Sequence, residues 1–297
     1  MHDTKGDRFM VIFIYAFLTI LALTTLYPFL NAIAVSFNQG SDTAKGGITV
    51  WPRHFTLENY AIVFKDERLM NGFFISVLRT VVGTITAILA TAIFSYGMSK
   101  KELVGRKYYM VLCIITMYFS GGLIPTFLLM RNLHLMNSFW IFIIPSLIGV
   151  WNMIIFRTFF QGLPAGLEES AKMDGCGNWS TLFRIVLPLS GPVIATLALF
   201  TAVSHWNEWF VASIYISKDD LMPIQTILKQ ILASNIVSEQ TAGLDAASLA
   251  HMQKAKTITS KSLSMATMMV ATLPIVCVYP FVQKYFVKGV LVGSLKE

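Results

Sequence analysis

The sequence predicts an all-α integral membrane protein with six transmembrane helices. Of its 297 residues, 55% are hydrophobic and only 13% are charged. A soluble domain carries about 25% charged residues, so this chain has too little polar surface to cover a soluble core. Six apolar runs each approach or exceed the roughly 20 residues that span a bilayer as a helix. A lipid-exposed segment must satisfy its own backbone hydrogen bonds, which favours helices throughout.

The first apolar run, residues 9–37, follows two basic residues and could be taken for a signal peptide. Ala32-Ile33-Ala34 is similar to a cleavage site, but the run far exceeds the roughly 7–15 residues of a signal core. We therefore expect an uncleaved first span. Nothing divides residues 1–297 into separate domains, and the other spans of this single transmembrane domain are predicted at residues 72–98, 108–130, 138–160, 189–216 and 262–283.

Orientation follows from the short loop of residues 99–107, which holds the densest basic cluster of the chain: Lys100, Lys101, Arg106 and Lys107. Short loops rich in lysine and arginine stay in the cytoplasm. This predicts a cytoplasmic N-terminus, C-terminus and segment 161–188. Residues 38–71 and 217–261 are then external polar segments. The net charge of +7 is spread over loops and span ends, so it does not indicate nucleic-acid binding.

Catalytic and cofactor motifs are not found. The sequence has no G-x-x-x-x-G-K-[ST] phosphate loop and no H-E-x-x-H pair, so we expect no ATP or metal on this chain. Its three cysteines, Cys113, Cys176 and Cys277, are far apart and suggest neither a disulfide framework nor a metal site. We expect a protein that is not an enzyme.

The polar segment 161–188 predicts two short helices joined by a sharp turn. Pro164 suits the first position of a helix, and Glu168-Glu169 favours its positive end. Gly175 can adopt the left-handed conformation that ends a helix. Asn178 is a good N-cap for the second helix, and Pro188 bounds it. We call this segment the elbow.

The elbow resembles the EAA loop of ABC importer permeases. Glu169-Ser170-Ala171, Asp174-Gly175 and the Ile185-x-Leu187-Pro188 ending fit its pattern, with Ser170 in place of alanine. The resemblance extends along the chain. Trp51-Pro52 with residues 55–60 is similar to the first external loop of carbohydrate-type permeases, and residues 119–125 and 279–289 are similar to the LplC-type subgroup. It implies the type I importer permease (MetI-like) fold with both termini cytoplasmic.

The resemblance also implies function and partners. The chain would be a multi-pass subunit in the bacterial plasma (inner) membrane, translocating a carbohydrate, expected to be an oligosaccharide. It would pair with a second permease subunit as a heterodimer within membrane lipid, with two ATPase subunits that hold ATP and Mg, and with an extracellular substrate-binding protein. No nucleic acid is expected. The elbow would dock on the ATPase through Leu167, Glu168, Glu169, Ser170, Ala171, Met173, Asp174 and Gly175, where Gly175 makes the bend.

A substrate pathway is a further expectation. Glu208 is the only acidic residue in a predicted span, and its neighbours Trp206 and Asn207 could stack on and hydrogen-bond a sugar. The alternative is an aromatic belt at the outer interface. Tyr118 and Phe119 precede a pair of glycines that either lets the helix unwind or serves close packing.

Three other functions stay open. The chain could be an ABC permease for a non-sugar solute. A secondary transporter would be expected to show inverted repeats and sites at the membrane midplane, and we find neither in the sequence. A membrane enzyme would need convergent polar groups within the spans, where only His205, Asn207 and Glu208 qualify.

Overall fold

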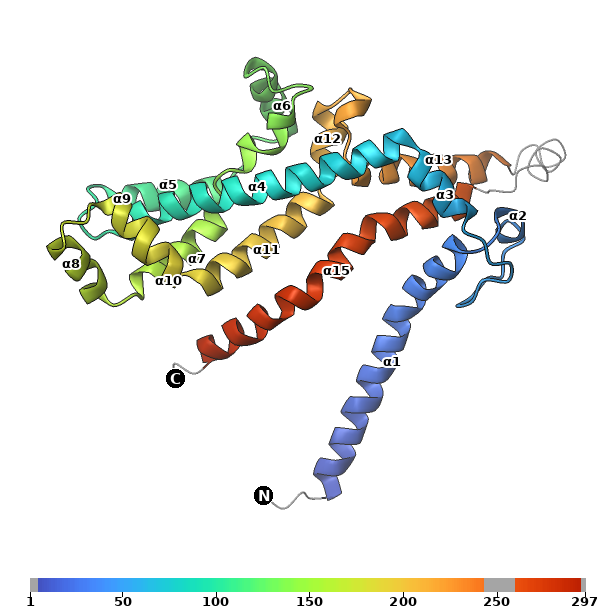
Figure 1. Cartoon of the computed structure of the whole chain (residues 1–297), viewed down its shortest axis with the longest axis horizontal. Helices are drawn as coiled ribbons and strands as arrows, with labels where there is room; N and C mark the ends of the chain where they lie inside the picture. Colours follow the sequence, from blue (N-terminus) through green and yellow to red (C-terminus); the bar gives the residue numbers. More distant parts are fainter. Residues whose placement is uncertain (1–4, 243–259, 295–297) are drawn as a thin grey trace. The chain divides into compact units, whose positions relative to one another are not determined.

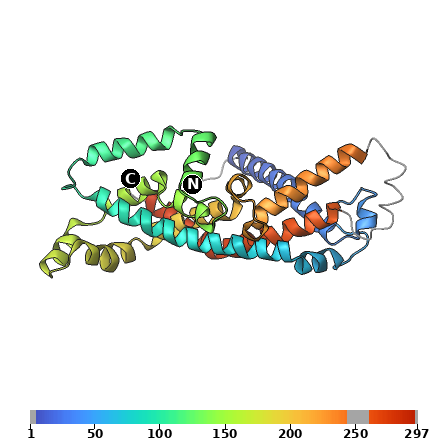
Figure 2. The ribbon, with the colours of Figure 1, turned by 90° about the horizontal axis from the view of Figure 1, so that it is seen from above.

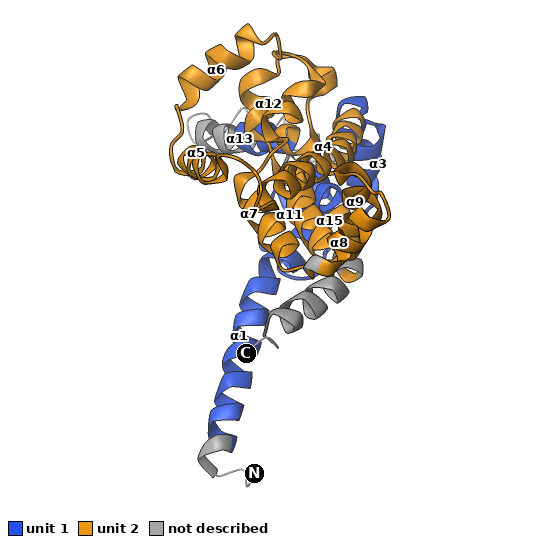
Figure 3. Cartoon of the chain, turned by 90° about the vertical axis from the view of Figure 1, so that its left-hand side faces the viewer, with its two compact units in different colours: residues 1–70, 228–273 blue, residues 71–227, 274–297 orange. Residues whose placement is uncertain are grey.

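The computed structural model describes residues 5–242 and 260–294, and Figure 1 shows an almost entirely helical chain. The chain divides into two compact units. One comprises residues 1–70 and 228–273, and the other comprises residues 71–227 and 274–297 (Figure 3).

The helices, in chain order, are α1 (Lys5–Ser36), α2 (Gly40–Thr43), α3 (Glu58–Lys65), α4 (Glu67–Ser99), α5 (Arg106–Tyr118), α6 (Leu123–Asn132), η1 (Phe139–Phe142), η2 (Ile144–Ser146), α7 (Val150–Gln161), α8 (Ala165–Met173), α9 (Asn178–Thr181), η3 (Leu182–Val186), α10 (Leu187–Leu189), α11 (Gly191–Asn207), α12 (Phe210–Tyr215), η4 (Asp219–Leu221), α13 (Ile224–Ala242) and α15 (Ser260–Ser294).

Three helices in the described part of the chain are long and apolar enough to cross a membrane by themselves: α1, α4 and residues 261–278 of α15. The side chains of residues 8–30 in α1 are all exposed. A helix that is apolar on every face is stable only inside a large core or in lipid, so α1 has the character of a membrane span. Pro274 and Pro280, which predict a kink, both lie inside α15 without ending it.

Two of the predicted spans bend sharply within their length, and a third bend lies at residue 190, where the elbow joins the predicted fifth span. Residues 106–132 bend by 113° between α5 and α6, residues 139–161 by 47° before α7, and residues 178–207 by 82° before α11. Glycine accounts for the first break, since Gly122 has a φ of 86°. The second break follows the short helix η2, which contains Pro145 in its first turn. The number of possible spans rises from three to six if each bent pair is one span.

The segment predicted as a polar external loop, residues 217–261, contains a helix. α13 begins at Ile224, and both Ile224 and Ile227 are fully buried. They pack so closely against Gly72 that a Cβ on that glycine would lie 2.6 Å from the Ile227 Cδ1. Sequence composition indicated a loop because the other residues of the helix are mostly polar. Residues 243–259 of the predicted loop lie outside the described residues.

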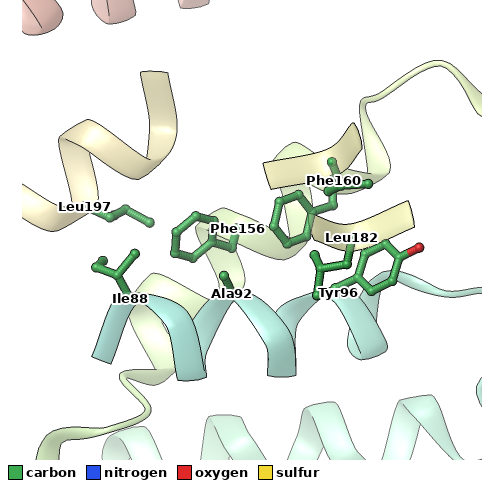
Figure 4. Packing of buried hydrophobic residues seen from close by; sticks show 8 residues of the cluster. Ile88, Ala92, Tyr96, Phe156, Phe160, Leu182 and Leu197 are labelled. Atoms are coloured by element: carbon green, nitrogen blue, oxygen red, sulfur yellow. The ribbon is translucent and has the colours of Figure 1, made fainter. Parts of the chain in front are cut away.

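The core of the second unit forms where α4, α7, η3 and α11 meet (Figure 4). Residues of α4 spaced four apart share one face, and so do Phe156 and Phe160 of α7, which stack at 5.6 Å. The cluster comprises Ile88, Ala92, Tyr96, Phe156, Phe160, Leu182, Val186 and Leu197. Lipid is as apolar as these side chains, so close packing rather than water exclusion stabilises the cluster.

In the first unit, the chain after α1 is held by a polar network around Asp42. Asn38, which is fully buried, donates to the Asp42 Oδ2 at 3.1 Å, and the Arg53 Nε donates to the same oxygen at 2.9 Å. Burial acts to raise the pKa of Asp42, but these hydrogen bonds outweigh it and lower the pKa below its ordinary value. Asn59 bonds the carbonyls of Ser36 and Asn38, so the segment packs as an ordered polar cap.

Candidate functional sites

The elbow consists of α8 and α9 with the turn between them. Its left-handed turn is the one that the sequence predicts, since Gly175 has a φ of 79°. The Cys176 amide donates to the Ala171 carbonyl at 2.9 Å and the Gly175 amide donates to the Lys172 carbonyl at 3.0 Å, which is the Schellman pattern of a helix end. The helices start one residue from their predicted positions: Pro164 is the N-cap of α8, and Gly177 is the N-cap of α9.

The second helix of the elbow does not stop at Pro188. The chain runs from α9 through η3, a π-helical segment, into α10, which contains Pro188 in its first turn. Proline has no amide to donate to the preceding turn, and the wider π-helical segment lies directly before it. The sharp bend of 82° comes two residues later, before α11. The elbow lies beyond the end of α4 in both Figure 1 and Figure 2.

The expected docking residues divide into exposed and engaged side chains. Met173 is 88% exposed and Leu167 is 40% exposed, so both present apolar surface. Glu169, Ser170 and Asp174 are exposed as well. Ala171 is 3% exposed and packs within its own chain. Glu168 is half-buried, and its carboxylate pairs with the Lys100 ammonium. The sequence drew attention to Lys100 only as part of a basic loop.

A cavity of about 400 Å³ lies among the helices of the second unit. Most of its lining is polar or aromatic: Arg79, Ile141, Phe142, Pro145, Ser146, Asn152, Phe200, Thr201, Ser204, His205, Glu208 and Val211. Asn152 of α7 donates to the Thr201 hydroxyl of α11 at 3.2 Å, so two walls are joined by side chains. Polar groups at membrane depth are costly, which makes such a cavity a candidate site.

Arg79 of α4 is the most buried cation at this cavity, with 1% of its surface exposed. Its Nη2 donates to the carbonyls of Trp206, at 3.3 Å, and Glu208. These carbonyls end α11, where the helix dipole is negative, so they partly balance the charge. The guanidinium also lies 5.3 Å from the centre of the Phe142 ring. Its Nε and Nη1 have no hydrogen-bond partner among the described residues.

Glu208 lies where the predicted fifth span breaks between α11 and α12. Its Oε1 accepts hydrogen bonds from the backbone amides of Phe210 at 2.6 Å and Val211 at 3.0 Å. The carboxylate therefore caps the start of α12, a position that favours a negative charge. The same side chain lines the cavity, so Glu208 both shapes the break and faces the candidate site.

The other residues of the expected substrate pathway do not line this cavity. Trp206 is 5% exposed and contacts Phe73 edge-on at 5.7 Å. Asn207 lines a separate, shallower depression together with Glu208. Tyr118 and Phe119 are about three-quarters exposed at the break between α5 and α6, where the glycine pair has unwound the helix. Of the five expected residues, only Glu208 reaches the cavity.

Several cavity residues were not among those predicted from the sequence. Arg79 lies within the second predicted span and belongs to no sequence motif. His205 was considered only as one of the polar groups that a membrane enzyme would need. It is 8% exposed and so close to Gly83 that a Cβ on the glycine would lie 2.6 Å from the His205 Nε2. Nothing in the sequence around Asn152 or Thr201 indicates that they line a cavity. A buried arginine inside a long apolar helix is the one feature that could have indicated this site.

Comparisons with known proteins agree with this architecture. The family described as "binding-protein-dependent transport system inner membrane component" matches residues 1–292. The chain is 40% identical over 290 residues to the polygalacturonan/rhamnogalacturonan transport system permease protein YtcP of Bacillus subtilis, covering 98% of this chain and 99% of the relative. It is also 40% identical over 296 residues to protein LplC of the same organism, covering 100% and 98%.

Among solved structures, a chain of a bacterial ABC transporter involved in the import of the acidic polysaccharide alginate is similar in fold and sequence. The TM-score is 0.87 at 28% identity, covering 96% of this chain and 99% of that one. Fold, length and sequence all agree with the resemblance of the chain to ABC importer permeases. The chain therefore belongs to the family of binding-protein-dependent transport system inner membrane components, which are membrane permease subunits of ABC importers and not enzymes.

Proposed function

We propose that this chain is one of two permease subunits of an ABC importer that moves an oligosaccharide across the bacterial plasma membrane. The observation that carries the proposal is the cavity bounded by α4, η1, η2, α7, α11 and α12. Its volume of about 400 Å³ is within the range of small-ligand sites, and hydroxyl, amide and aromatic side chains line it together. Such a lining suits the hydroxyl groups and the apolar face of a sugar ring. Saccharide transport by the similar proteins supports the same substrate class.

In this proposal the six predicted spans all cross the membrane, and residues 106–132 and 139–161 each count as one bent span. The elbow and both termini are cytoplasmic. The test uses single-cysteine variants at Lys101 and Ser234, both in described parts of the chain. A membrane-impermeant thiol reagent should label the Ser234 variant from outside and the Lys101 variant only after the membrane is opened. The reverse pattern would exclude this topology.

The elbow is proposed to dock on an ATPase subunit, and the exposed Leu167, Met173 and Glu169 support this assignment. The complex would hold a second, different permease, two ATPase subunits and an extracellular binding protein. ATP and Mg would bind only to the ATPase subunits, and this chain would carry no cofactor. Closure of the ATPase pair would move the elbow and switch the cavity between its two openings.

Uptake by the purified complex in liposomes tests the function directly. We expect ATP-dependent accumulation of a labelled oligosaccharide that needs the binding protein, and no accumulation with a catalytically inactive ATPase. A panel of neutral and acidic oligosaccharides, tested first for binding to the extracellular protein, identifies the substrate. Accumulation of a non-sugar solute in place of every oligosaccharide would assign the chain to the other branch of ABC permeases.

A further inference from the structure

The ion pair between Lys100 and Glu168 joins two segments that are 68 residues apart in the sequence. Lys100 directly follows α4, and Glu168 lies in the first turn of α8. The two side chains are only 20% and 27% exposed. Fully exposed ion pairs contribute little, because water screens them. This pair is shielded on both sides, so it can hold α8 in place.

Lys100 is also held by an aromatic face. Its Nζ lies 4.0 Å from the centre of the Tyr96 ring, one turn earlier in the chain. Tyr96 is itself buried in the core of the unit and contacts Phe160 edge-on at 6.2 Å. Burial acts to lower the pKa of Lys100, but the ion pair with Glu168 and the contact with the Tyr96 ring outweigh it and raise the pKa. The ammonium therefore stays charged between a carboxylate and a ring.

The end of α4 is fixed by α7 as well. The Arg157 Nε donates to the Met98 carbonyl at 3.2 Å, and the Gln161 Nε2 donates to the Ser99 carbonyl at 3.3 Å. The last carbonyls of a helix have no partner within the helix, so these side chains satisfy them. The carboxyl end of α4 is thus a fixed point of the core, and Lys100 extends from it to the elbow.

We infer that Lys100 and Glu168 form a strut inside the permease that passes movement of the elbow to α4. The inference rests on the proposed docking of the elbow. Glu168 acts as a positioning residue that faces its own chain, while Glu169, its exposed neighbour about 100° around the helix, is left for the ATPase. The two adjacent carboxylates therefore have different partners. Because α4 also carries Arg79 at the cavity, the strut connects the docking surface to the wall of the candidate site.

A charge swap tests the strut. In the reconstituted complex, Glu168→Lys and Lys100→Glu should each lower the amount of sugar imported per ATP hydrolysed by about tenfold, and the double variant should recover to within about threefold of the wild type. Glu169→Lys is the matched control, because Lys100→Glu should not rescue it. The inference would be overturned if the losses of the two single variants simply added in the double variant. It would also be overturned if Lys100→Glu rescued Glu169→Lys as well as it rescues Glu168→Lys.

A second measurement does not depend on transport. Hydrogen exchange of the α8 amides is followed in the assembled complex in lipid nanodiscs. Glu168→Gln should speed exchange across residues 167–173 by about tenfold, whereas Glu169→Gln should leave it near the wild-type rate. Equal exchange in the two variants would refute the strut even if uptake of the sugar had failed. Conversely, faster exchange only in Glu168→Gln would support the strut whatever solute the importer carries.

Discussion

The elbow and the cavity satisfy their free backbone groups in opposite ways. At the end of α8, the elbow uses its own backbone: the amides of Gly175 and Cys176 close the helix on carbonyls a few residues earlier. At the break after α11, the cavity uses side chains, with Arg79 donating to the carbonyls and Glu208 accepting from the amides of α12. Arg79 and Glu208 are 129 residues apart in the chain.

This difference suits the two tasks that we propose, docking for the elbow and transport for the cavity. A docking element must keep its shape while a partner covers its surface, so a turn that depends only on the local chain is robust. A transport cavity needs irregular backbone at membrane depth, which is tolerated only where the surrounding protein supplies hydrogen bonds. The elbow should therefore respond to changes in backbone conformation, and the cavity should respond to changes in charge and hydrogen bonding.

The largest effect is expected at Arg79. Arg79→Leu leaves the Trp206 and Glu208 carbonyls without this donor, at a cost of about 1–3 kcal/mol for each group that stays buried. We expect a lower thermal unfolding midpoint of the purified complex in nanodiscs and loss of uptake. Arg79→Lys keeps the charge and a donor and should lose less stability. If Arg79→Leu unfolded at the wild-type temperature, the cavity would not depend on this side chain.

A smaller effect is expected at Gly175. A β-branched residue in the left-handed conformation costs about 1–2 kcal/mol. No atom lies within 4 Å of a Cβ at this position, so the penalty comes from backbone conformation and not from a clash. Gly175→Val should weaken retention of the ATPase during purification, whereas Gly175→Asn, which tolerates this conformation, should retain most of it. Equal retention in both variants would show that the turn does not set the docking surface.

Two variants of Glu208 distinguish the effect of its charge from the effect of its helix cap. Glu208→Gln keeps an oxygen for the amides of Phe210 and Val211, whereas Glu208→Ala removes the cap at a cost of about 1 kcal/mol. If the charge contacts substrate, Glu208→Gln should raise the substrate concentration needed for half-maximal uptake while assembly and basal ATP hydrolysis stay near normal. Unchanged uptake kinetics in Glu208→Gln with impaired Glu208→Ala would limit the residue to capping the helix.

The smallest effect is expected at Asp42, in a polar network outside both regions. The pKa of Asp42 is lowered in the folded chain, so its contribution to stability is present above the unfolded pKa of about 3.9 and is lost as the pH falls further. The protection factors of residues 38–60, in which the intrinsic pH dependence of amide exchange is divided out, should therefore fall as the pH is lowered below about 4. In Arg53→Leu, the folded pKa of Asp42 moves back towards the unfolded one, so the pH-dependent fall in protection should be smaller. An identical pH dependence in the two proteins would contradict the network.

The sequence predicted features that depend on neighbouring residues or on overall composition. The long apolar helices follow from hydropathy, and the elbow follows from Gly175 and its flanking residues. The breaks within the spans were missed in part, because a run of apolar residues looks the same whether or not the helix is bent. Only the glycine pair before Leu123 gave a local sign. α13 was missed because few buried residues mark its face.

The contacts that build the sites could not be predicted, because they join distant segments. Nothing near Lys100 indicates that it meets Glu168, and nothing near Arg79 indicates that it bonds the end of α11. A buried arginine in an apolar helix needs partners, but the sequence does not say which. Such pairs become visible only when packing of the core has set which helix faces meet.

The π-helical segment η3 has a consequence for how the elbow can move. Each of its turns holds one residue more than an α-helical turn, and it lies between α9 and the bend before α11. If the segment rewound to α-helical bonding, α9 would rotate about its axis by about 100° and shift by about 1.5 Å relative to α10. Because the π-helical segment holds one extra residue, a change to α-helical bonding there would rotate the elbow while α9 and α10 keep their own hydrogen bonds.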